Sequence, residues 1–290
     1  MADNKTILVT GANGQLGSEM KVIAAAYSHH NFIFVSKEAL AIDDEAAVRY
    51  FFSSHPIDCC VNCAAYTAVD KAETETEKAM QINAIAVGNL AKICSEQKAL
   101  FIHISTDYVF DGTATEPYKE DDLVSPVNFY GASKLKGEEL AIQNNPDSII
   151  IRSSWVYSSF GNNFVKTMLR LMSERESINV VSDQLGCPTY AADLAAAIMQ
   201  IIKSKMQLTG STIFNFSNKG AITWYQFAEA IKELSKSNCI VHPIPAAQYP
   251  TPAKRPSYSV MDTTKIQQKF NLVIPFWKDS LVKCLQLLGK

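Results

Sequence analysis

The sequence has little that would attach the protein to a membrane, to nucleic acid or to a metal. No stretch approaches the roughly 18 to 20 consecutive apolar residues of a membrane-spanning helix. The N-terminus carries no basic flank and no cleavable apolar segment. A net charge of only −2 gives no electrostatic footprint for nucleic acid, and the five histidines show no metal-ligand spacing. We therefore expect a cytoplasmic protein that binds small molecules, with no nucleic acid, no membrane and no metal.

Cysteine usage excludes a disulfide framework. Seven is an odd number, and the cysteines are scattered along the chain, which fits small buried side chains in a reducing compartment. Cys60 and Cys63 have the spacing of a redox or zinc motif, but they lie in the apolar run 57–65. No second pair of ligands has suitable spacing for zinc. We expect this pair to serve packing only.

Short apolar runs alternate with helical stretches through the first half of the chain. The expected strands span 6–10, 31–36, 57–63, 100–105 and 148–153. The expected helices span 15–27, 45–54, 74–97 with a break near Asn83, and 130–144. Strands that are apolar on both faces and alternate with helices predict an α/β fold with a doubly wound, Rossmann-like parallel sheet.

After about residue 155 the alternation loosens. We expect helices at 163–174, 191–203, 224–235, 264–270 and 278–288, with short strands at 179–181, 212–216 and 240–243. The stretch 243–256 holds five of the eleven prolines, which favours an ordered loop. The sequence predicts a dinucleotide-binding domain over residues 1–155. A smaller α/β substrate lobe over 156–290 would be interwoven with it.

A glycine-rich segment follows the first strand. Gly11 allows a tight turn, Gly14 lets the backbone approach a pyrophosphate, and Gly17 lets the next helix pack on the sheet. The spacing is G-x-x-G-x-x-G rather than the commoner G-x-G-x-x-G, but its place between a strand and a helix favours dinucleotide binding over an ordinary turn. The expected cofactor contacts here are Gly11, Asn13, Gly14, Gln15, Leu16 and Gly17.

The end of the second strand indicates which nicotinamide cofactor fits. An acidic residue there would accept hydrogen bonds from a ribose 2′-hydroxyl. This strand instead ends in Ser36 and Lys37, a hydroxyl and a cation that suit a 2′-phosphate. The pattern favours NADP(H), with NAD(H) as a second cofactor; Lys37 as an ordinary loop lysine is the alternative.

Tyr130 and Lys134 lie one turn apart on a predicted helix and so share a face. A phenol with its usual pKa of about 10 exchanges protons slowly at neutral pH. A neighbouring ammonium favours the phenolate and is expected to lower the pKa of Tyr130. Thr106 follows the strand 100–105, at the carboxyl edge where open α/β sheets bind ligands. These three residues are the predicted catalytic group of a carbonyl reductase; a surface Tyr and Lys on an amphipathic helix is the alternative.

The chain resembles the extended short-chain dehydrogenase/reductase superfamily and, within it, the family of the dTDP-4-dehydrorhamnose reductases. The similar segments span 11–17, 61–73, 105–111, 130–134, 152–157, 161–170, 183–189 and 249–256. The resemblance implies the final step of dTDP-L-rhamnose synthesis, the reduction of a 4-keto group on a dTDP-sugar. It implies that Tyr130 is the general acid, that Lys134 also binds the nicotinamide ribose, and that Thr106 hydrogen-bonds the reacting oxygen. The further residues that it implies are Ile42, Ala64, Ala65, Tyr66 and Thr67 at the cofactor, and Val69, Asp107, Trp155 and Arg255 at the substrate.

Several of these residues have structural alternatives. Thr67 and Asp70 have the spacing of a helix capping box, and Trp155 could belong to the core. Arg255 could neutralise the nucleotide diphosphate or pin its loop to a carboxylate.

Some family members dimerise through magnesium held by glutamates. Glu19 matches one of these, but the glutamate expected near residue 192 is missing. The sequence therefore implies a monomer or a weak homodimer.

Two other functions compete with a reductase. A sugar-nucleotide epimerase or dehydratase of the same superfamily would keep the Tyr–Lys pair, but a dehydratase usually has an acidic pair beside the threonine. Here Thr106 is followed by Asp107 and Tyr108. A non-catalytic regulatory subunit with this fold would tolerate loss of Tyr130 or Lys134, so their retention argues against it.

Overall fold

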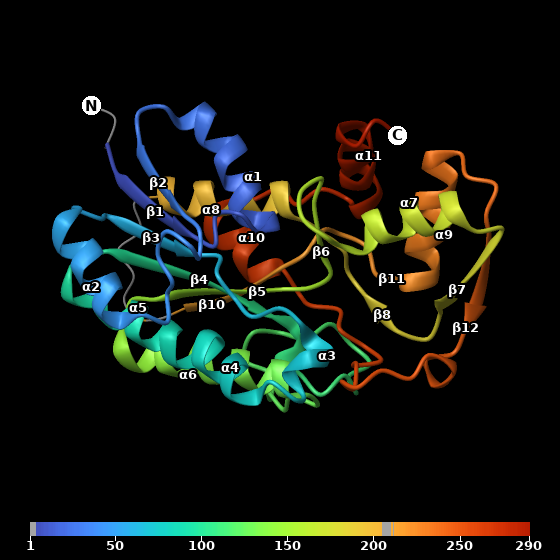
Figure 1. Ribbon diagram of the computed structural model, residues 1–290, viewed down its shortest axis with the longest axis horizontal. Helices are drawn as coiled ribbons and strands as arrows, with labels where there is room; N and C mark the ends of the chain where they lie inside the picture. The colour runs from blue at the N-terminus through green and yellow to red at the C-terminus, as the bar shows by residue number, and fades with distance from the viewer. Residues whose placement is uncertain (1–3, 205–209, 211) are drawn as a thin grey trace.

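A parallel sheet forms the centre of the computed structural model, which describes residues 4–204, 210 and 212–290. Within these residues the sheet has six strands in the order β10-β5-β4-β3-β1-β2 (Figure 1), and every neighbouring pair is parallel. The strands are β1 (Thr6–Thr10), β2 (Asn31–Val35), β3 (Cys59–Asn62), β4 (Leu100–Thr106), β5 (Ile149–Ser153) and β10 (Thr212–Phe216). The chain starts at β1, next to the edge strand β2, and adds β3, β4, β5 and β10 on the other side of β1. The doubly wound, Rossmann-like sheet predicted from the sequence is confirmed.

Helices cover both faces of this sheet (Figure 1). On one face lie α1 (Gln15–Ala24), α8 (Ala191–Lys203) and α10 (Thr264–Phe270). On the other lie α2 (Glu45–Ser54), α5 (Ala86–Glu96) and α6 (Phe129–Asn144). Ile7 and Val9 point into the first layer and Leu8 into the second, and all three are fully buried. Because successive strand residues alternate between faces, a strand covered on both sides is a continuous apolar run.

The predicted break near Asn83 is confirmed and has a structural cause. After the short helices α3 (Val69–Ala72) and α4 (Thr76–Met80), the chain forms a π-helical segment, Gln81–Ile85, before α5. The buried Asn83 side chain accepts a hydrogen bond from Tyr66 N (2.8 Å) and donates to Tyr66 O and Ser133 Oγ (both 3.0 Å). The π-helical turn thus places the Asn83 side chain where it pairs with the backbone N–H and C=O of Tyr66, in the loop after β3. Both groups are in the interior, where an unpaired polar group would be destabilising.

Residues after 155 contribute to both parts of the molecule. Strand β10 and helices α8 and α10 complete the sheet layers, whereas the rest forms a smaller lobe with its own apolar core around Tyr157, Phe227 and Leu281. The lobe contains helices α7 (Phe164–Glu174), α9 (Trp224–Ser235) and α11 (Trp277–Leu287). Its strand pairs are β6 (Val156–Tyr157) with β9 (Thr189–Tyr190), β7 (Ser177–Val181) with β12 (Ile240–Ile244), and β8 (Leu185–Gly186) with β11 (Ile222–Thr223).

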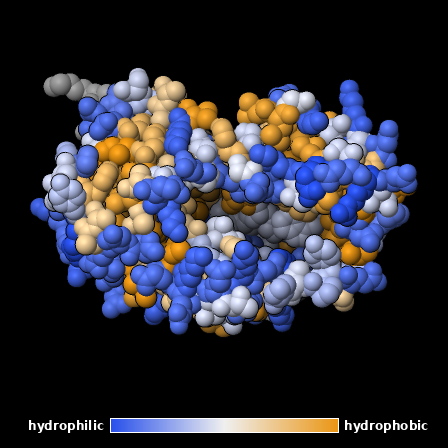
Figure 2. Space-filling model, in the orientation of Figure 1, coloured by the Kyte–Doolittle hydropathy of each residue, from blue (hydrophilic) through white to orange (hydrophobic). Residues whose placement is uncertain are grey.

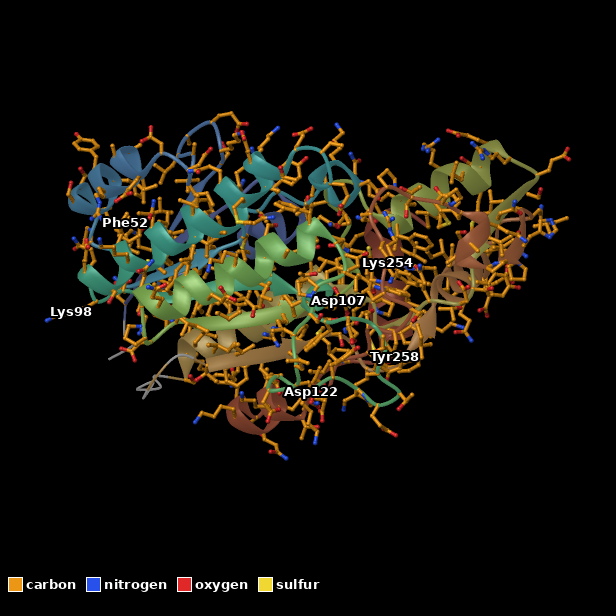
Figure 3. All side chains as sticks on the ribbon, turned by 90° about the horizontal axis from the view of Figure 1, so that it is seen from below. Phe52, Lys98, Asp107, Asp122, Lys254 and Tyr258 are labelled. Atoms are coloured by element: carbon orange, nitrogen blue, oxygen red, sulfur yellow. The ribbon has the colours of Figure 1, made fainter. Side chains whose placement is uncertain are left out.

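The junction of the two parts lies at the carboxyl edge of the sheet. In Figure 3, Asp107, Lys254 and Tyr258 lie where the parts meet, and Phe52 and Lys98 lie toward the far end of the sheet. Among the described residues, no helix is both long and apolar enough to cross a bilayer. Because the smaller lobe lies at this edge, the loops after β1, β3, β4 and β5 are directed toward it.

Candidate active site

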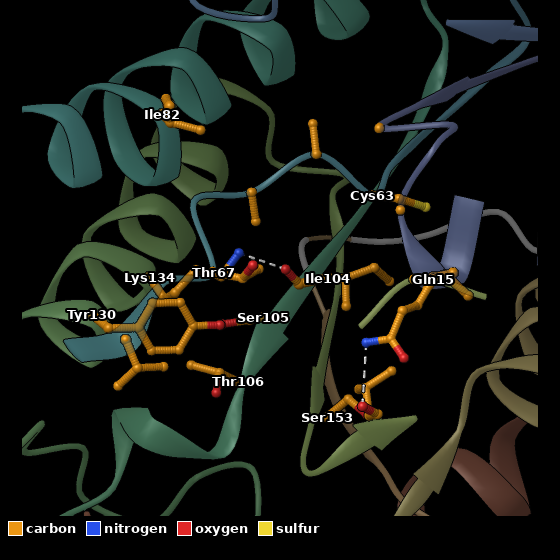
Figure 4. Close-up of a pocket in the computed structure, with 18 of the residues that line it drawn as sticks. Gln15, Cys63, Thr67, Ile82, Ile104, Ser105, Thr106, Tyr130, Lys134 and Ser153 are labelled. Atoms are coloured by element: carbon orange, nitrogen blue, oxygen red, sulfur yellow. Dashed lines mark hydrogen bonds between the residues drawn. The ribbon is translucent and has the colours of Figure 1, made fainter. Parts of the chain in front are cut away.

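A cavity of about 760 Å³ opens between the sheet and the smaller lobe. It is visible as a hollow in Figure 2 and in close-up in Figure 4. Residues from the loops after β1, β3, β4 and β5 line it, at the edge where parallel sheets bind ligands. The predicted site residues that line it are Gly11, Asn13, Gly14, Gln15, Leu16, Lys37, Ile42, Ala64, Ala65, Thr67, Val69, Thr106, Asp107, Tyr130, Lys134 and Trp155.

The glycine loop has the shape that a pyrophosphate requires. Gly11 has φ +62°, and a Cβ there would lie 2.6 Å from Ala64 N. A Cβ on Gly17 would lie 2.4 Å from Gly11 O, so this glycine serves the packing of α1, and it lies outside the cavity lining. Gly14 precedes α1, and among the described side chains none caps this helix end. Its first-turn N–H groups are therefore left for an anion, and the loop fits a dinucleotide.

The loop after β2 carries three of the predicted cofactor contacts, Ser36, Lys37 and Ile42. The exposed Lys37 lines the cavity, as does the buried Ile42. Ser36 lies outside the lining, and its hydrogen bond to the exposed Glu38 lowers the pKa of that carboxyl group. Of the two residues predicted to suit a 2′-phosphate, Lys37 faces the cavity, whereas the hydroxyl of Ser36 is directed to Glu38.

Helix α6 carries Tyr130 into the cavity. Asn128 caps the helix by accepting a hydrogen bond from Gly131 N (2.8 Å), and the Tyr130 ring makes an edge-to-face contact with Tyr108. Burial raises the pKa of Tyr130 to about 12, although a hydrogen bond with Thr106 opposes this. The expected lowering of this pKa is wrong for the protein alone, because burial disfavours the phenolate more strongly. The phenol is therefore fully protonated at neutral pH.

Lys134 lies one turn further along α6 and is fully buried, whereas Tyr130 is half-buried. Its Nζ donates a hydrogen bond to Ile104 O at 2.7 Å, drawn as a dashed line in Figure 4, and lies 3.2 Å from His103 Nε2. Burial lowers the pKa of Lys134 to about 8, and the charge of Glu138 opposes that shift. A lysine with this pKa exchanges protons readily near neutral pH.

Thr106 and Asp107 follow Tyr130 along the cavity wall. Thr106 Oγ1 donates a hydrogen bond to Asp107 Oδ1 at 3.0 Å and accepts one from Tyr108 N at 3.3 Å. Burial raises the pKa of Asp107 to about 6, against hydrogen bonds with Ser259 and Thr106 that lower it. The threonine hydroxyl thus lies between the phenol and a buried carboxyl group.

Trp155 forms the wall on the side of the smaller lobe. Its backbone is in the left-handed region, with φ +47°, which is rare for a bulky residue and often marks a functional site. The indole stacks on Trp224, with ring centroids 3.5 Å apart, and both rings line the cavity. Trp224 was missed by the sequence analysis. Its only signal was an aromatic residue at the start of a predicted helix.

Arg255 and Asp70 form a bidentate ion pair, with N–O distances of 3.0 and 2.9 Å. Two roles were predicted for Arg255: neutralising the nucleotide diphosphate or pinning its loop to a carboxylate. Arg255 does not line the cavity, and the structure shows the second role, with Asp70 as the carboxylate. The Thr67–Asp70 capping box is wrong: the residue before α3 is Ala68, and Asp70 holds the 253–255 loop instead. Tyr66, a predicted cofactor contact, also lies outside the lining and is buried.

Gln15 and two residues of the smaller lobe join the two sides of the cavity. Gln15 Nε2 donates to Val156 O (3.4 Å), and Asn163 Nδ2 donates to Gln15 Oε1 (2.9 Å). The first of these bonds is the second dashed line in Figure 4. Gly161 and Asn162 line the cavity beside them and were not foreseen from the sequence.

Comparison with known proteins gives consistent similarity over nearly the whole chain. The family described as "RmlD substrate binding domain" matches residues 5–289. The dTDP-4-dehydrorhamnose reductase of Aggregatibacter actinomycetemcomitans is 38% identical over 285 residues, which cover 95% of this chain and 96% of the relative. The spore coat polysaccharide biosynthesis protein SpsK of Bacillus subtilis is 40% identical over 282 residues, with 97% and 96% covered.

A solved structure is similarly close. The crystal structure of dTDP-4-dehydrorhamnose reductase from Bacillus anthracis in complex with NADP aligns with a TM-score of 0.93 at 35% identity. The alignment covers 98% of this chain and 99% of that chain. The similarity therefore extends over the sheet and the smaller lobe together.

Proposed function

The chain belongs to the family of the dTDP-4-dehydrorhamnose reductases, and from this premise we propose that Tyr130, Lys134 and Thr106 carry its chemistry. Its reaction is the NADP(H)-dependent reduction of the 4-keto group of dTDP-4-dehydrorhamnose to dTDP-L-rhamnose, the last step of dTDP-L-rhamnose biosynthesis. The observation that supports the catalytic assignment is the phenol of Tyr130, half-buried in the same cavity as the glycine loop and hydrogen-bonded with Thr106.

The proposed chemistry follows from the protonation states in the cavity. When bound at the glycine loop, NADPH would supply the hydride for the carbonyl carbon. Tyr130 gives its phenolic proton to the carbonyl oxygen, so the product is an alcohol and Tyr130 is left as a phenolate. Thr106 holds the reacting oxygen, and Val69 and Trp155 bound the space for the deoxysugar. A phenol with its pKa raised to about 12 holds its proton until an alkoxide, which is more basic, forms beside it.

The test of this function is a turnover assay with dTDP-4-dehydrorhamnose and NADPH, followed by identification of the product. Consumption of NADPH with formation of dTDP-rhamnose is expected. An epimerase would instead retain a tightly bound cofactor through purification and convert the sugar without net NADPH loss. A regulatory subunit would bind without turnover. Either outcome contradicts the proposal.

Lys37 is proposed to select NADPH, with NADH accepted as a second cofactor. The Lys37→Ala variant is expected to raise KM for NADPH about fivefold, because an exposed cation–phosphate contact is worth about 1 kcal/mol. Since NADH lacks the 2′-phosphate, its KM in the same variant serves as the matched control and should not change. Equal changes in both constants would remove Lys37 from the 2′-phosphate site.

We also propose that the enzyme works in the cytoplasm as a monomer or weak homodimer. All seven cysteines lie within the described residues as free thiols, which suits a reducing compartment. Glu19, the match to a metal-binding glutamate of dimeric relatives, is buried and accepts a hydrogen bond from Ser158 Oγ at 2.6 Å. Analytical ultracentrifugation with and without magnesium tests the assembly state, and a tight magnesium-dependent dimer would overturn this proposal.

A further inference from the structure

A chain of buried hydrogen bonds runs behind the cavity from the sheet to Lys134. Thr10 Oγ1 donates to Asn62 Oδ1 (2.6 Å), Asn62 Nδ2 lies 3.1 Å from His103 Nδ1, and His103 Nε2 lies 3.2 Å from Lys134 Nζ. Thr10, Asn62 and His103 sit on β1, β3 and β4, and each is fully buried; Lys134 is 1% exposed. Thr10, Asn62 and His103 have no role in the proposed function, yet their hydrogen-bond chain leads to Lys134, one of the proposed catalytic groups.

The orientation of Asn62 sets the tautomer of His103. Asn62 Oδ1 accepts a hydrogen bond from the backbone N–H of Ala64 at 3.2 Å. Because a backbone N–H is only a donor, the amide oxygen must lie on that side, and the amide nitrogen then faces the histidine. His103 Nδ1 is therefore the acceptor, and the single proton of the uncharged imidazole sits on Nε2.

This tautomer decides what Lys134 does at its contact with His103. The Nε2–H group is a donor, and an ammonium has three donors and no lone pair. The 3.2 Å contact is a hydrogen bond only when Lys134 is an uncharged amine that accepts from Nε2–H. In that state Lys134 Nζ still donates to Ile104 O. When Lys134 is charged, two donors face each other across the contact.

We propose that His103, oriented by Thr10 and Asn62, is a positioning residue that stabilises the uncharged form of Lys134. The proposal rests on the proposed function and extends it to the return of the proton. After each reduction the Tyr130 phenolate must regain a proton, and the Lys134 ammonium, one turn further along α6 in the same cavity, supplies it, which leaves a phenol and an amine. The amine accepts Nε2–H of His103 and is then recharged by one proton from bulk water. The return is downhill, because Lys134 is the stronger acid of the two.

The charged groups around Lys134 agree with this assignment. On α6 it feels the charge of Glu138, and on β4 it lies against His103. Glu138 favours the charged amine, but its carboxylate is held by Arg152 of β5 at 2.7 Å. Asp107 lies beyond Tyr130 and acts on the phenol. Burial keeps the pKa of His103 well below its usual value, so the imidazole is uncharged at neutral pH.

The first test is the tautomer of His103, measured by NMR on protein with ¹⁵N-labelled histidine. The ¹⁵N shifts of the other four histidines are separated from it by the His103→Gln variant. We expect a protonated Nε2 and a bare Nδ1. A proton on Nδ1 overturns the proposal. Since this measurement needs no turnover, it is independent of whether the chain reduces the keto-sugar.

The second test is the titration of Lys134, followed through ¹³C-labelled lysine and assigned by loss of its signal in Lys134→Ala. In Asn62→Asp the carboxylate requires Nδ1–H, so the bare Nε2 accepts from the ammonium. In His103→Gln an amide oxygen takes that place. Both variants are expected to raise the pKa of Lys134 by about one unit, since the charged form gains an acceptor. The alkaline limb of the pH–rate profile should move up equally.

Phe101→Leu is the matched control, because Phe101 stacks on His103 from the same strand without joining the hydrogen bonds. It should leave the pKa of Lys134 in place. If neither Asn62→Asp nor His103→Gln moves that pKa, or if Phe101→Leu moves it as much, His103 acts through packing alone and the proposal is overturned. Two variants are used so that poor folding of one leaves the other as the test.

Discussion

Tyr130→Phe is expected to lower kcat about a thousandfold while leaving the affinity for NADPH within about a factor of two. Loss of a positioned general acid typically costs 10²- to 10⁴-fold in rate. The substitution removes only the hydroxyl, so the edge-to-face contact with Tyr108 and the packing of α6 remain. Stopped-flow measurement of NADPH consumption, with cofactor affinity from fluorescence titration, checks both halves of the expectation.

Tyr108→Phe provides the matched control for that variant. Tyr108 lines the same cavity and its ring contacts the Tyr130 ring, but Thr106 Oγ1 accepts a hydrogen bond from the Tyr108 backbone N–H rather than from its hydroxyl. Its kcat should fall less than about tenfold. If Tyr130→Phe keeps wild-type turnover, or if the two variants lose activity equally, Tyr130 is not the proton donor.

Glu138→Ala is expected to lower the free energy of unfolding by about 3–5 kcal/mol, since it leaves a buried arginine without its partner. Glu138 and Arg152 form a two-oxygen ion pair with N–O distances from 2.7 to 3.2 Å, and both side chains are at most 3% exposed. Ser105 Oγ also donates to the same carboxylate. The pair thus fastens α6, and with it Tyr130 and Lys134, to β4 and β5. Urea denaturation followed by circular dichroism gives the change in stability.

Glu139→Ala is the control on the same helix. Glu139 pairs with Lys136 at 2.8 Å, but both side chains are about half exposed, so its loss should cost under about 0.5 kcal/mol. Similar losses for Glu138→Ala and Glu139→Ala would mean that the buried pair contributes no more than a surface pair. Replacement of both Glu138 and Arg152 by apolar residues should recover much of the lost stability, since no unpaired charge remains.

The fold was largely predictable because its signals are local. The strands are apolar runs flanked by helices, so their residues mark a sheet covered on both faces, as Ile7, Leu8 and Val9 illustrate. The break at Asn83 was visible as a polar residue in a long helical stretch. Strands β6, β8, β9 and β11 were missed because two residues carry no periodicity.

The site was predictable in its residues more than in its electrostatics. Sixteen of the predicted residues line one cavity. They could be predicted because glycine spacing and the ends of strands can be recognised in the sequence. The direction of the Tyr130 pKa shift was not predictable, since it depends on burial from every side. Arg255 and Asp70 are 185 positions apart, and no local sequence pattern predicts that two residues at that separation form an ion pair. The stack of Trp155 on Trp224 likewise depends on how the smaller lobe closes over the sheet.

The position of β10 has a consequence for how the chain is made. Until residue 216 has left the ribosome, β5 has an open hydrogen-bonding edge, and until residue 270 has left, the face beneath α8 and α10 lacks part of its cover. A nascent chain that ends at residue 155 therefore exposes unpaired strand edges and apolar surface. Chaperone capture should be strongest in this window of synthesis, and a fragment cut at that point should aggregate rather than fold.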